Sequence, residues 1–184
     1  SKIEKMALST IEEDVYILAG VPSWTMVLSN KILEITGKSN LKEVWPNLEL
    51  FMHGGVNFEP YREEFKRLIP DPEMHYVETY NASEGFFGIQ DIVDTGDLLL
   101  MLDYGIYYEF IPMESYKGVH STTVIDLSEV EPGVNYAMVI STNAGIWRYI
   151  IGDTVMFTST LPYRFKITGR TKSFINTFGE ELIV

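Results

Sequence analysis

The spacing of the apolar residues changes near residue 74, and this change constrains the fold more than any other feature of the sequence. Before it, apolar residues recur at helical spacing, and Pro22 and Gly37 stand where helices start or stop. From Met74 onward, short runs of β-branched and aromatic residues are separated by Gly, Pro, Asn and Asp, as in antiparallel hairpins. We therefore expect a mixed α/β chain of the α+β kind, with a helical first half followed by a β-rich antiparallel region.

The helical part is expected to hold helices with short interruptions and one strand. Ser9 and Thr10 are predicted N-caps of the first helix, because the acidic residues that follow them would then lie in its first turn. This helix is expected to run through residues 17–20 until Pro22 ends or restarts it. A strand over residues 48–52 is expected to lead into a pair of glycines. The spacing over residues 58–70 predicts an amphipathic helix after that pair.

Composition limits the classes of partner. With 184 residues, of which 46% are hydrophobic, the chain is long enough for one packed domain, or for one domain and part of another. Its formal charge of −12 and scattered basic residues argue against a nucleic-acid surface. There are no cysteines, which excludes disulfides and thiolate metal sites, and no run has the length of a signal peptide or a membrane span. We expect a cytoplasmic protein that binds neither nucleic acid nor membrane.

Two motifs place small residues where a ligand could bind. Gly54 and Gly55 follow a predicted strand and would let the backbone approach a ligand, although an ordinary turn explains the pair alone more simply. In "YNASEG", the Ser83 hydroxyl suits a phosphate oxygen and the Glu84 carboxylate suits Mg²⁺, while Tyr80 offers a flat face for a purine. A hairpin turn is the alternative explanation of this second motif.

Two later motifs add charged groups. Asp153 can accept the hydroxyls of a ribose, with a β-turn as the alternative explanation. Gly169 and Arg170 end a predicted strand, and Arg170 and Lys172 suit phosphate or ribose oxygens, with a solvated hairpin as the alternative. The order of the four motifs along the chain is more informative than any one of them.

Five stretches carry a resemblance to a known family: "AGVPSW", "MHGGVNFEPYREEF", "YNASEGFFG", "YEFIPM" and "GRTKSFINTFGEEL". They resemble the auxin-responsive acyl acid amido synthetases, in a bacterial-type form, within the adenylate-forming superfamily. The resemblance covers nearly the whole chain and implies the central part of the large N-terminal lobe of an adenylate-forming enzyme. It implies a helix-rich part with an acid-pocket wall over residues 1–73, a β-rich nucleotide-binding part over 74–168, and a hinge with the start of a C-terminal lobe over 169–184.

The resemblance also implies roles for single residues. The nucleotide-binding set has Gly54 and Gly55 lining the adenine pocket, Tyr80 stacking on adenine, Ser83 at the α-phosphate, Asp153 at the ribose and Arg170 nearest the nucleotide. Glu84 would hold magnesium, and Lys172 would lie at the hinge. The catalytic set is Ser83, Glu84, Arg170 and Lys172. The acid pocket would be walled by Val21, Pro22, Ser23, Trp24 and Val27.

The implied chemistry is a two-step ligation that uses ATP and magnesium. A small carboxylic acid is activated as an acyl-adenylate and then transferred to the amine of an amino acid. The family often has Arg where this chain has Ile150, which removes a charge contact expected from this turn. The phosphate loop and most of the C-terminal lobe are missing, so the chain alone is expected to be an incomplete, inactive fragment of an enzyme, with a degenerate product without activity as the other explanation. The alternative is a non-catalytic nucleotide- or acid-binding module on the same fold.

Overall fold

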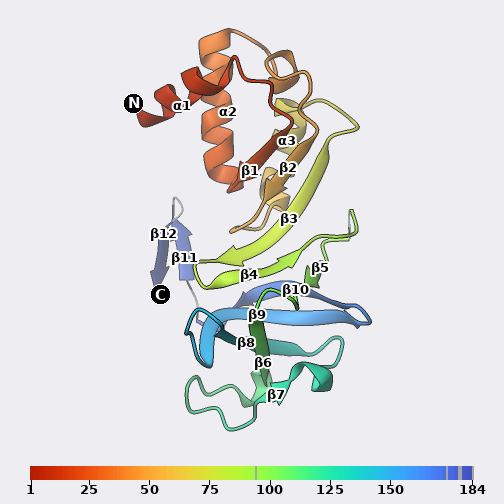
Figure 1. The fold of residues 1–184 in the computed structure, drawn as a ribbon. Coiled ribbons are helices and arrows are strands. Elements are labelled where there is room, and N and C mark those ends of the chain that lie inside the picture. The colour runs from red at the N-terminus through yellow and green to blue at the C-terminus, as the bar shows by residue number, and fades with distance from the viewer. Residues whose placement is uncertain (94, 173, 178–179, 184) are drawn as a thin grey trace. The chain divides into compact units, whose positions relative to one another are not determined.

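The chain forms two compact units, Ser1–Tyr80 (unit 1) and Asn81–Val184 (unit 2). The computed structural model describes residues 1–93, 95–172, 174–177 and 180–183 (Figure 1). Residues 173, 178–179 and 184 of the predicted hinge segment lie outside that description. Within the described part of the chain, every helix falls short of the length and apolarity that a membrane span requires.

Unit 1 is a small parallel sheet with helices. Its strands pair in the order β1-β2-β3, and both pairings are parallel. The strands are β1 (Ile17–Gly20), β2 (Leu50–His53) and β3 (His75–Ala82), whose last two residues fall in unit 2. The helices are α1 (Lys2–Thr10), α2 (Pro22–Thr36) and α3 (Arg62–Leu68), with the 3₁₀ turns η1 (Leu41–Glu43) and η2 (Glu59–Tyr61).

The start of unit 1 differs from the sequence prediction. Ser1, rather than Ser9 or Thr10, caps the first helix, in a capping box with Glu4. Ser9 and Thr10 lie at the other end of α1, where both hydroxyls donate to the carbonyl of Met6. Residues 17–20 were expected to be helical but form β1, because pairing with β2 satisfies their backbone hydrogen bonds. A short apolar run does not show by itself whether such a partner strand exists.

Two local signals in unit 1 are confirmed. Helix α2 begins at Pro22, whose fixed φ suits the first helical position, and ends at Gly37, whose φ of 67° closes it. The core beneath the helices is rich in aromatic rings: Phe51 stacks on Phe65 with centroids 4.6 Å apart, and both are fully buried. Buried aromatic area of this kind is the main stabilising contribution in a small unit.

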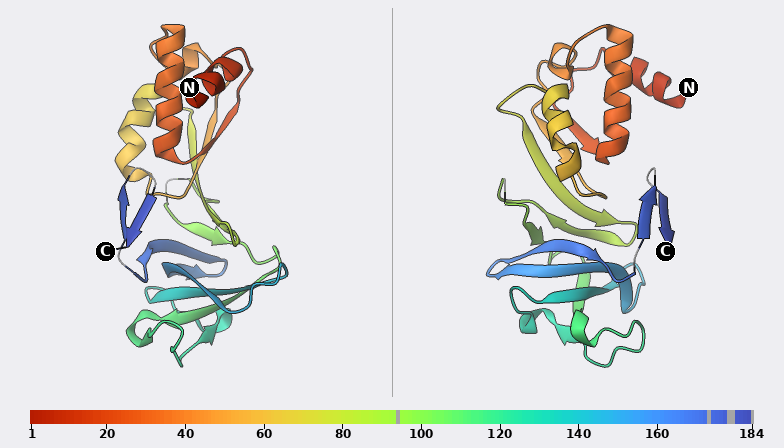
Figure 2. Two further views of the ribbon diagram at one scale, coloured as in Figure 1. Left: turned by 90° about the vertical axis from the view of Figure 1, so that its left-hand side faces the viewer. Right: turned by 180° about the vertical axis from the view of Figure 1, so that it is seen from behind.

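Unit 2 is an antiparallel sheet whose strands pair in the order β4-β5-β10-β9-β8-β6-β7. The strands are β4 (Gly85–Ile89), β5 (Leu98–Leu100), β6 (Ile106–Pro112), β7 (Ile125–Asp126), β8 (Asn135–Thr142), β9 (Tyr149–Thr160) and β10 (Tyr163–Arg170), with the 3₁₀ turns η3 (Met113–Ser115) and η4 (Leu127–Glu129). Strands β9 and β10 run side by side as the longest ribbon of this unit (Figure 2). Strands β11 (Phe174–Thr177) and β12 (Glu180–Ile183) form a separate antiparallel pair.

Buried side chains of unit 2 lie on both faces of these strands, since Ile111, Ala137 and Val139 form a hydrophobic cluster of their own. Phenylalanines on four different strands are also buried, and Phe110 and Phe157 meet edge to face with centroids 5.1 Å apart. Phe87 and Phe165 are likewise fully buried. The antiparallel β-rich region is thus confirmed for unit 2, whereas the first strand after Met74, β3, begins as a parallel strand of unit 1.

Candidate functional site

Asp153 and Arg170 form the best-defined polar group among the predicted site residues. They face each other on the neighbouring strands β9 and β10, and Arg170 Nε lies 3.0 Å from Asp153 Oδ1. The carboxylate side chain is 14% exposed and the guanidinium side chain 38% exposed. The strand register thus brings together an acceptor and a cation that lie 17 residues apart in sequence, at the end of β10.

The backbone around this pair is held in place. Gly152 has φ of 93°, a conformation that favours glycine, and its carbonyl accepts hydrogen bonds from the amide and the hydroxyl of Thr171. The amide nitrogen of Thr171 lies 2.8 Å from the carbonyl oxygen of Gly152, and Oγ1 of Thr171 lies 3.2 Å from the same oxygen. Because Thr171 is tied back to Gly152, the segment that carries Arg170 is fixed next to Asp153. Lys172 follows it with an exposed side chain.

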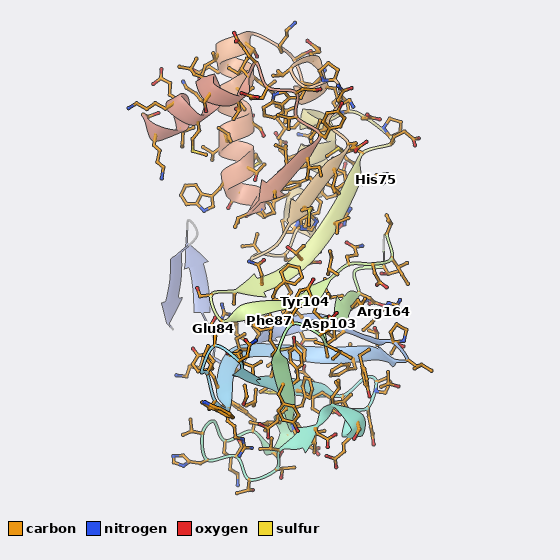
Figure 3. All side chains as sticks on the ribbon, in the orientation of Figure 1. His75, Glu84, Phe87, Asp103, Tyr104 and Arg164 are labelled. Carbon is orange, nitrogen blue, oxygen red and sulfur yellow. The ribbon has the colours of Figure 1, made fainter. Side chains whose placement is uncertain are left out.

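Ser83 and Glu84 form the two-residue turn between β3 and β4, so the hairpin predicted as the alternative is present. Ser83 is exposed and Glu84 is half-buried. Both have a negative φ, because Arg148 is the only residue besides glycines that has a positive φ among the described residues. A turn position does not exclude a ligand role, because it leaves the hydroxyl and the carboxylate beyond the strand ends. Figure 3 shows Glu84 at this turn, toward the opposite side of unit 2 from Arg164.

The donor set around Glu84 bears on how magnesium would bind. Among the described residues, no group of three or more His, Cys, Asp or Glu side chains is close enough to hold a metal ion. Mg²⁺ in nucleotide sites usually takes one or two carboxylates and completes its shell with phosphates and water. A lone carboxylate on a turn fits that mode and does not fit an all-protein metal cage.

The glycine pair has a packing role in unit 1. A Cβ on Gly54 would collide with the backbone carbonyl of Thr79 on β3, and Gly55 has φ of 80°. Next to this contact, the Thr79 hydroxyl donates to the carbonyl of His53 at 3.1 Å. Tyr80, the next residue of β3, is 6% exposed. The close approach of β2 and β3 therefore accounts for Gly54 before any ligand is considered.

The predicted acid-pocket wall lies at the start of α2. Val21 is the extended residue before the helix, Pro22 is buried and Ser23 is half-buried. Trp24 is 59% exposed and Val27 46% exposed, so two large apolar side chains face away from the core of unit 1. Exposed apolar groups at neighbouring positions of one helix suit contact with an apolar ligand or with other protein.

His53, which precedes the glycine pair, is packed in unit 1. It is 4% exposed, and its ring stacks on Phe58 with centroids 4.0 Å apart. Burial, and secondly the charge of Arg62, lowers the pKa of His53 from 6.5 to about 4. A neutral imidazole in this position acts as an aromatic core residue.

Sequence reasoning gave no sign of Arg148 as a special position. Its φ of 46° is unusual for a residue with a Cβ. The amide of Arg148 donates to Ser141 Oγ at 3.0 Å, and its Nε donates to Glu109 Oε2 at 3.0 Å. The residue type at position 148 does not indicate a left-handed backbone, because the local signals for it are Gly, Asn and Asp.

Comparisons with known proteins agree on one family. The model of the GH3 family N-terminal domain matches residues 1–74, and the model of the GH3 family central domain matches residues 99–170. The chain is 29% identical over 127 residues to the indole-3-acetic acid-amido synthetase GH3.4 of Arabidopsis thaliana, covering 64% of this chain and 21% of that protein. It is 30% identical over 129 residues to the jasmonoyl–L-amino acid synthetase GH3.5 of Oryza sativa subsp. japonica, covering 61% of this chain and 22% of that protein.

Solved structures show the same fold. The chain aligns over its whole length with 41% of the AtGH3.15 acyl acid amido synthetase in complex with 2,4-DB, with a TM-score of 0.72 and 16% identity. It aligns over 98% of its length with 42% of a 2-hydroxyisobutyryl-CoA ligase, with a TM-score of 0.66 and 13% identity. The chain spans about a fifth of the length of the curated relatives it matches.

Proposed function

This chain belongs to the GH3 family, and from that premise we propose that it is the nucleotide-binding part of an ATP-dependent ligase. The ligase would activate a small carboxylic acid as an acyl-adenylate and transfer the acyl group to the amine of an amino acid. The relatives support this class, since they include an indole-3-acetic acid-amido synthetase and a jasmonoyl–L-amino acid synthetase.

The observation that carries the proposal is the Asp153–Arg170 pair. A carboxylate that is 14% exposed and already oriented by a guanidinium is suited to accept the two ribose hydroxyls of ATP. The same guanidinium would supply positive charge beside the nucleotide. Arg170 is the last residue of β10, two residues before Lys172. A preformed acceptor and donor of this kind lose little freedom when the nucleotide binds.

In the first step, a carboxylate oxygen of the acid attacks the α-phosphorus of ATP, the bond to the bridging oxygen breaks, and pyrophosphate leaves. Ser83 would donate its hydroxyl proton in a hydrogen bond to an α-phosphate oxygen, and Arg170 and Lys172 would offset the charge that builds on the phosphates. Glu84 would hold magnesium, which when bound neutralises phosphate charge. None of these side chains forms a covalent bond to substrate.

In the second step, the neutral amine of an amino acid attacks the carbonyl carbon of the acyl-adenylate. The bond to the phosphate oxygen breaks, AMP leaves, and the amine loses a proton as the amide forms. The part of this chain in that step is to keep the adenylate in place through Asp153 and Arg170. Trp24 and Val27 would contribute apolar surface to the acid pocket.

Asp153→Asn tests the role of the Asp153–Arg170 pair, and the chain offers a matched control. Asp91 also pairs with an arginine of β10, Arg164, at distances of 2.9 and 2.6 Å, and Figure 3 shows Arg164 toward the other side of unit 2 from Glu84. Asp153→Asn should weaken ATP binding by about tenfold or more, because a charge-assisted acceptor is lost, whereas Asp91→Asn should change it by less than about twofold. Equilibrium dialysis with labelled ATP measures both. Equal effects of the two variants would contradict the assignment.

Glu84→Gln tests the metal role separately. It should raise the magnesium concentration needed for half-maximal adenylation by about tenfold in the full-length protein, while the midpoint of urea unfolding stays that of the parent. If adenylation responds to magnesium as it does in the parent, Glu84 does not hold the metal.

A further inference from the structure

Strands β9 and β10, labelled in Figure 1, pair through a β-bulge near the end of β10. The pairing is regular as far as Ile167, which lies opposite Val155. The neighbouring residue of β9, Thr154, lies opposite Gly169, so Thr168 is an extra residue on β10. A bulge bends its strand and redirects the side chains that follow it, and bulges are frequent beside active sites.

This bulge determines which residue of β10 faces Asp153. Without it, regular pairing would set Gly169 opposite Asp153. Arg170 would then lie opposite Gly152, with its side chain on the other face of the sheet. With one extra residue in β10, Arg170 lies opposite Asp153 instead, and its Nε is 3.0 Å from Oδ1 of that carboxylate. The Asp153–Arg170 pair therefore depends on the bulge.

The Thr168 hydroxyl ties the bulge to two other strands. Its Oγ1 lies 2.6 Å from Oδ1 of Asn135 on β8 and 2.9 Å from Oγ1 of Thr154 on β9. A hydroxyl has one proton and an amide oxygen accepts, so Thr168 donates to Asn135 and accepts from Thr154. Thr154 is 3% exposed, and a hydrogen bond from a buried group is stronger than one made in water.

The backbone beyond the extra residue is fixed as well. Gly169 has a φ of 151°, which favours glycine, although a Cβ there would have room, since Oγ1 of Thr154 would lie 3.7 Å from it. The amide of Thr171 donates to the carbonyl of Gly152 at 2.8 Å, which continues the bulged register. The bulge is thus held by a side chain within it and by a backbone hydrogen bond after it.

We propose that Thr168 is a positioning residue of the nucleotide site. Its hydroxyl stabilises the bulge that brings the guanidinium of Arg170 to Asp153, and the guanidinium orients the carboxylate that accepts the ribose hydroxyls of ATP. Thr168 acts through these two residues and not by contact with the nucleotide. The inference rests on the proposed function, because it takes Asp153 as the ribose acceptor. It adds that selectivity for the ribose depends on a side chain of the sheet behind that acceptor.

The affinities of the full-length protein for ATP and for dideoxy-ATP test this role. Dideoxy-ATP keeps the adenine and the phosphates but lacks both ribose hydroxyls, so the ratio of the two affinities reports on the ribose contact. The parent should bind ATP about tenfold or more tightly than dideoxy-ATP, because charge-assisted hydrogen bonds are lost. Thr168→Val keeps the side-chain shape and should reduce this preference about fivefold, with the affinity for dideoxy-ATP unchanged. Equilibrium dialysis with labelled nucleotides measures both affinities.

Three further variants isolate the hydroxyl of Thr168. Thr158 is the extra residue of a second bulge between β9 and β10, and its hydroxyl donates to the carbonyl of Arg164 at 3.3 Å. Thr158→Val makes the same substitution at that bulge and should keep the preference of the parent. Thr168→Ser retains the hydroxyl and should keep it too. Asn135→Ala removes the acceptor on β8 and should reduce the preference, which provides a second test if Thr168→Val fails to fold.

The outcomes separate this inference from the proposed function. If the parent prefers ATP and Asp153→Asn removes that preference, but Thr168→Val keeps it, the inference fails while the ribose site stands. An equal loss of affinity for both nucleotides in Thr168→Val, or the same loss of preference in Thr158→Val, would show a purely structural role and overturn the inference. If the parent binds both nucleotides equally, Asp153 is not the ribose acceptor, and the proposed site fails together with the inference.

Discussion

Replacing His53 by Phe should remove much of the acid sensitivity of unit 1. The imidazole is 4% exposed, stacks on Phe58, and has an Nδ1 without a hydrogen-bond partner among the described residues. Its pKa is about 4, against 6.5 for the ordinary value, because burial and then the charge of Arg62 disfavour the protonated ring. The unfolded chain therefore binds one more proton than the folded chain between these two pH values.

The magnitude follows from the two pKa values. Stability contributed by a neutral buried His is fully present above about pH 6.5, is lost as the pH falls, and levels off below about pH 4. Lowering a pKa from 6.5 to about 4 changes the free energy of unfolding by about 3 kcal/mol in full, of which about 1.4 kcal/mol is lost by pH 5.5 and about 2.5 kcal/mol by pH 4.5. Phe keeps the ring and removes the titration.

Urea unfolding monitored by Trp45 fluorescence measures this effect in unit 1. Trp45 is 2% exposed, and in a Trp24→Phe, Trp147→Phe background it is the one remaining tryptophan of the three in the chain. The stability of His53→Phe relative to its parent should rise by about 2.5 kcal/mol between pH 7.5 and pH 4.5. His75→Phe, at an exposed position on β3, should show no such rise. A difference between His53→Phe and its parent that stays constant with pH would refute the reasoning.

Three further variants test single features of the structure by urea unfolding. Gly54→Ala should destabilise unit 1 by about 2 kcal/mol or more, because the new Cβ collides with the rigid backbone carbonyl of Thr79, and parent-like stability would show that the strands separate easily there. Arg148→Ala should be less stable than Arg148→Gly by about 1 kcal/mol, since both lose the side-chain bond but only glycine relieves the positive φ; the reverse order would contradict the left-handed backbone. Asp91→Asn should lower the unfolding midpoint above about pH 5, and the difference from the parent should disappear as the pH falls below 3.8. The reason is that Arg164 lowers the pKa of Asp91, and the stability so gained is lost when that carboxylate is protonated; a difference that persists in acid would contradict the ion pair.

The sequence correctly predicted helix ends that depend on the conformational preference of a single residue. Pro22 and Gly37 bound α2 as expected, because a fixed φ and a permitted positive φ act within one residue. Residues 17–20 were predicted wrongly as helix, since their strand conformation depends on pairing with β2, about thirty residues away. A short apolar run carries no information about such a partner.

In the candidate site, too, the residues were predicted from the sequence but their contacts were not. Asp153 and Arg170 were both predicted from the family resemblance, but their direct pairing depends on the register of β9 and β10, which no spacing in the sequence reveals. The ligand roles assigned to all of the site residues stay predictions. Arg148 was missed because its left-handed backbone depends on hydrogen bonds that it donates to Ser141 on β8 and Glu109 on β6, which lie 7 and 39 residues away in the sequence.

ATP–pyrophosphate exchange in the full-length protein, with magnesium and a panel of small aromatic, aliphatic and hydroxy acids, tests the central claim most directly. The account predicts exchange that requires one class of acid and that falls by about tenfold or more in Asp153→Asn but not in Asp91→Asn. Exchange would establish acyl-adenylate formation whatever the amine proves to be. ATP binding without exchange for any acid would contradict the ligase and leave a non-catalytic nucleotide-binding module, and the absence of ATP binding would remove the nucleotide site as well.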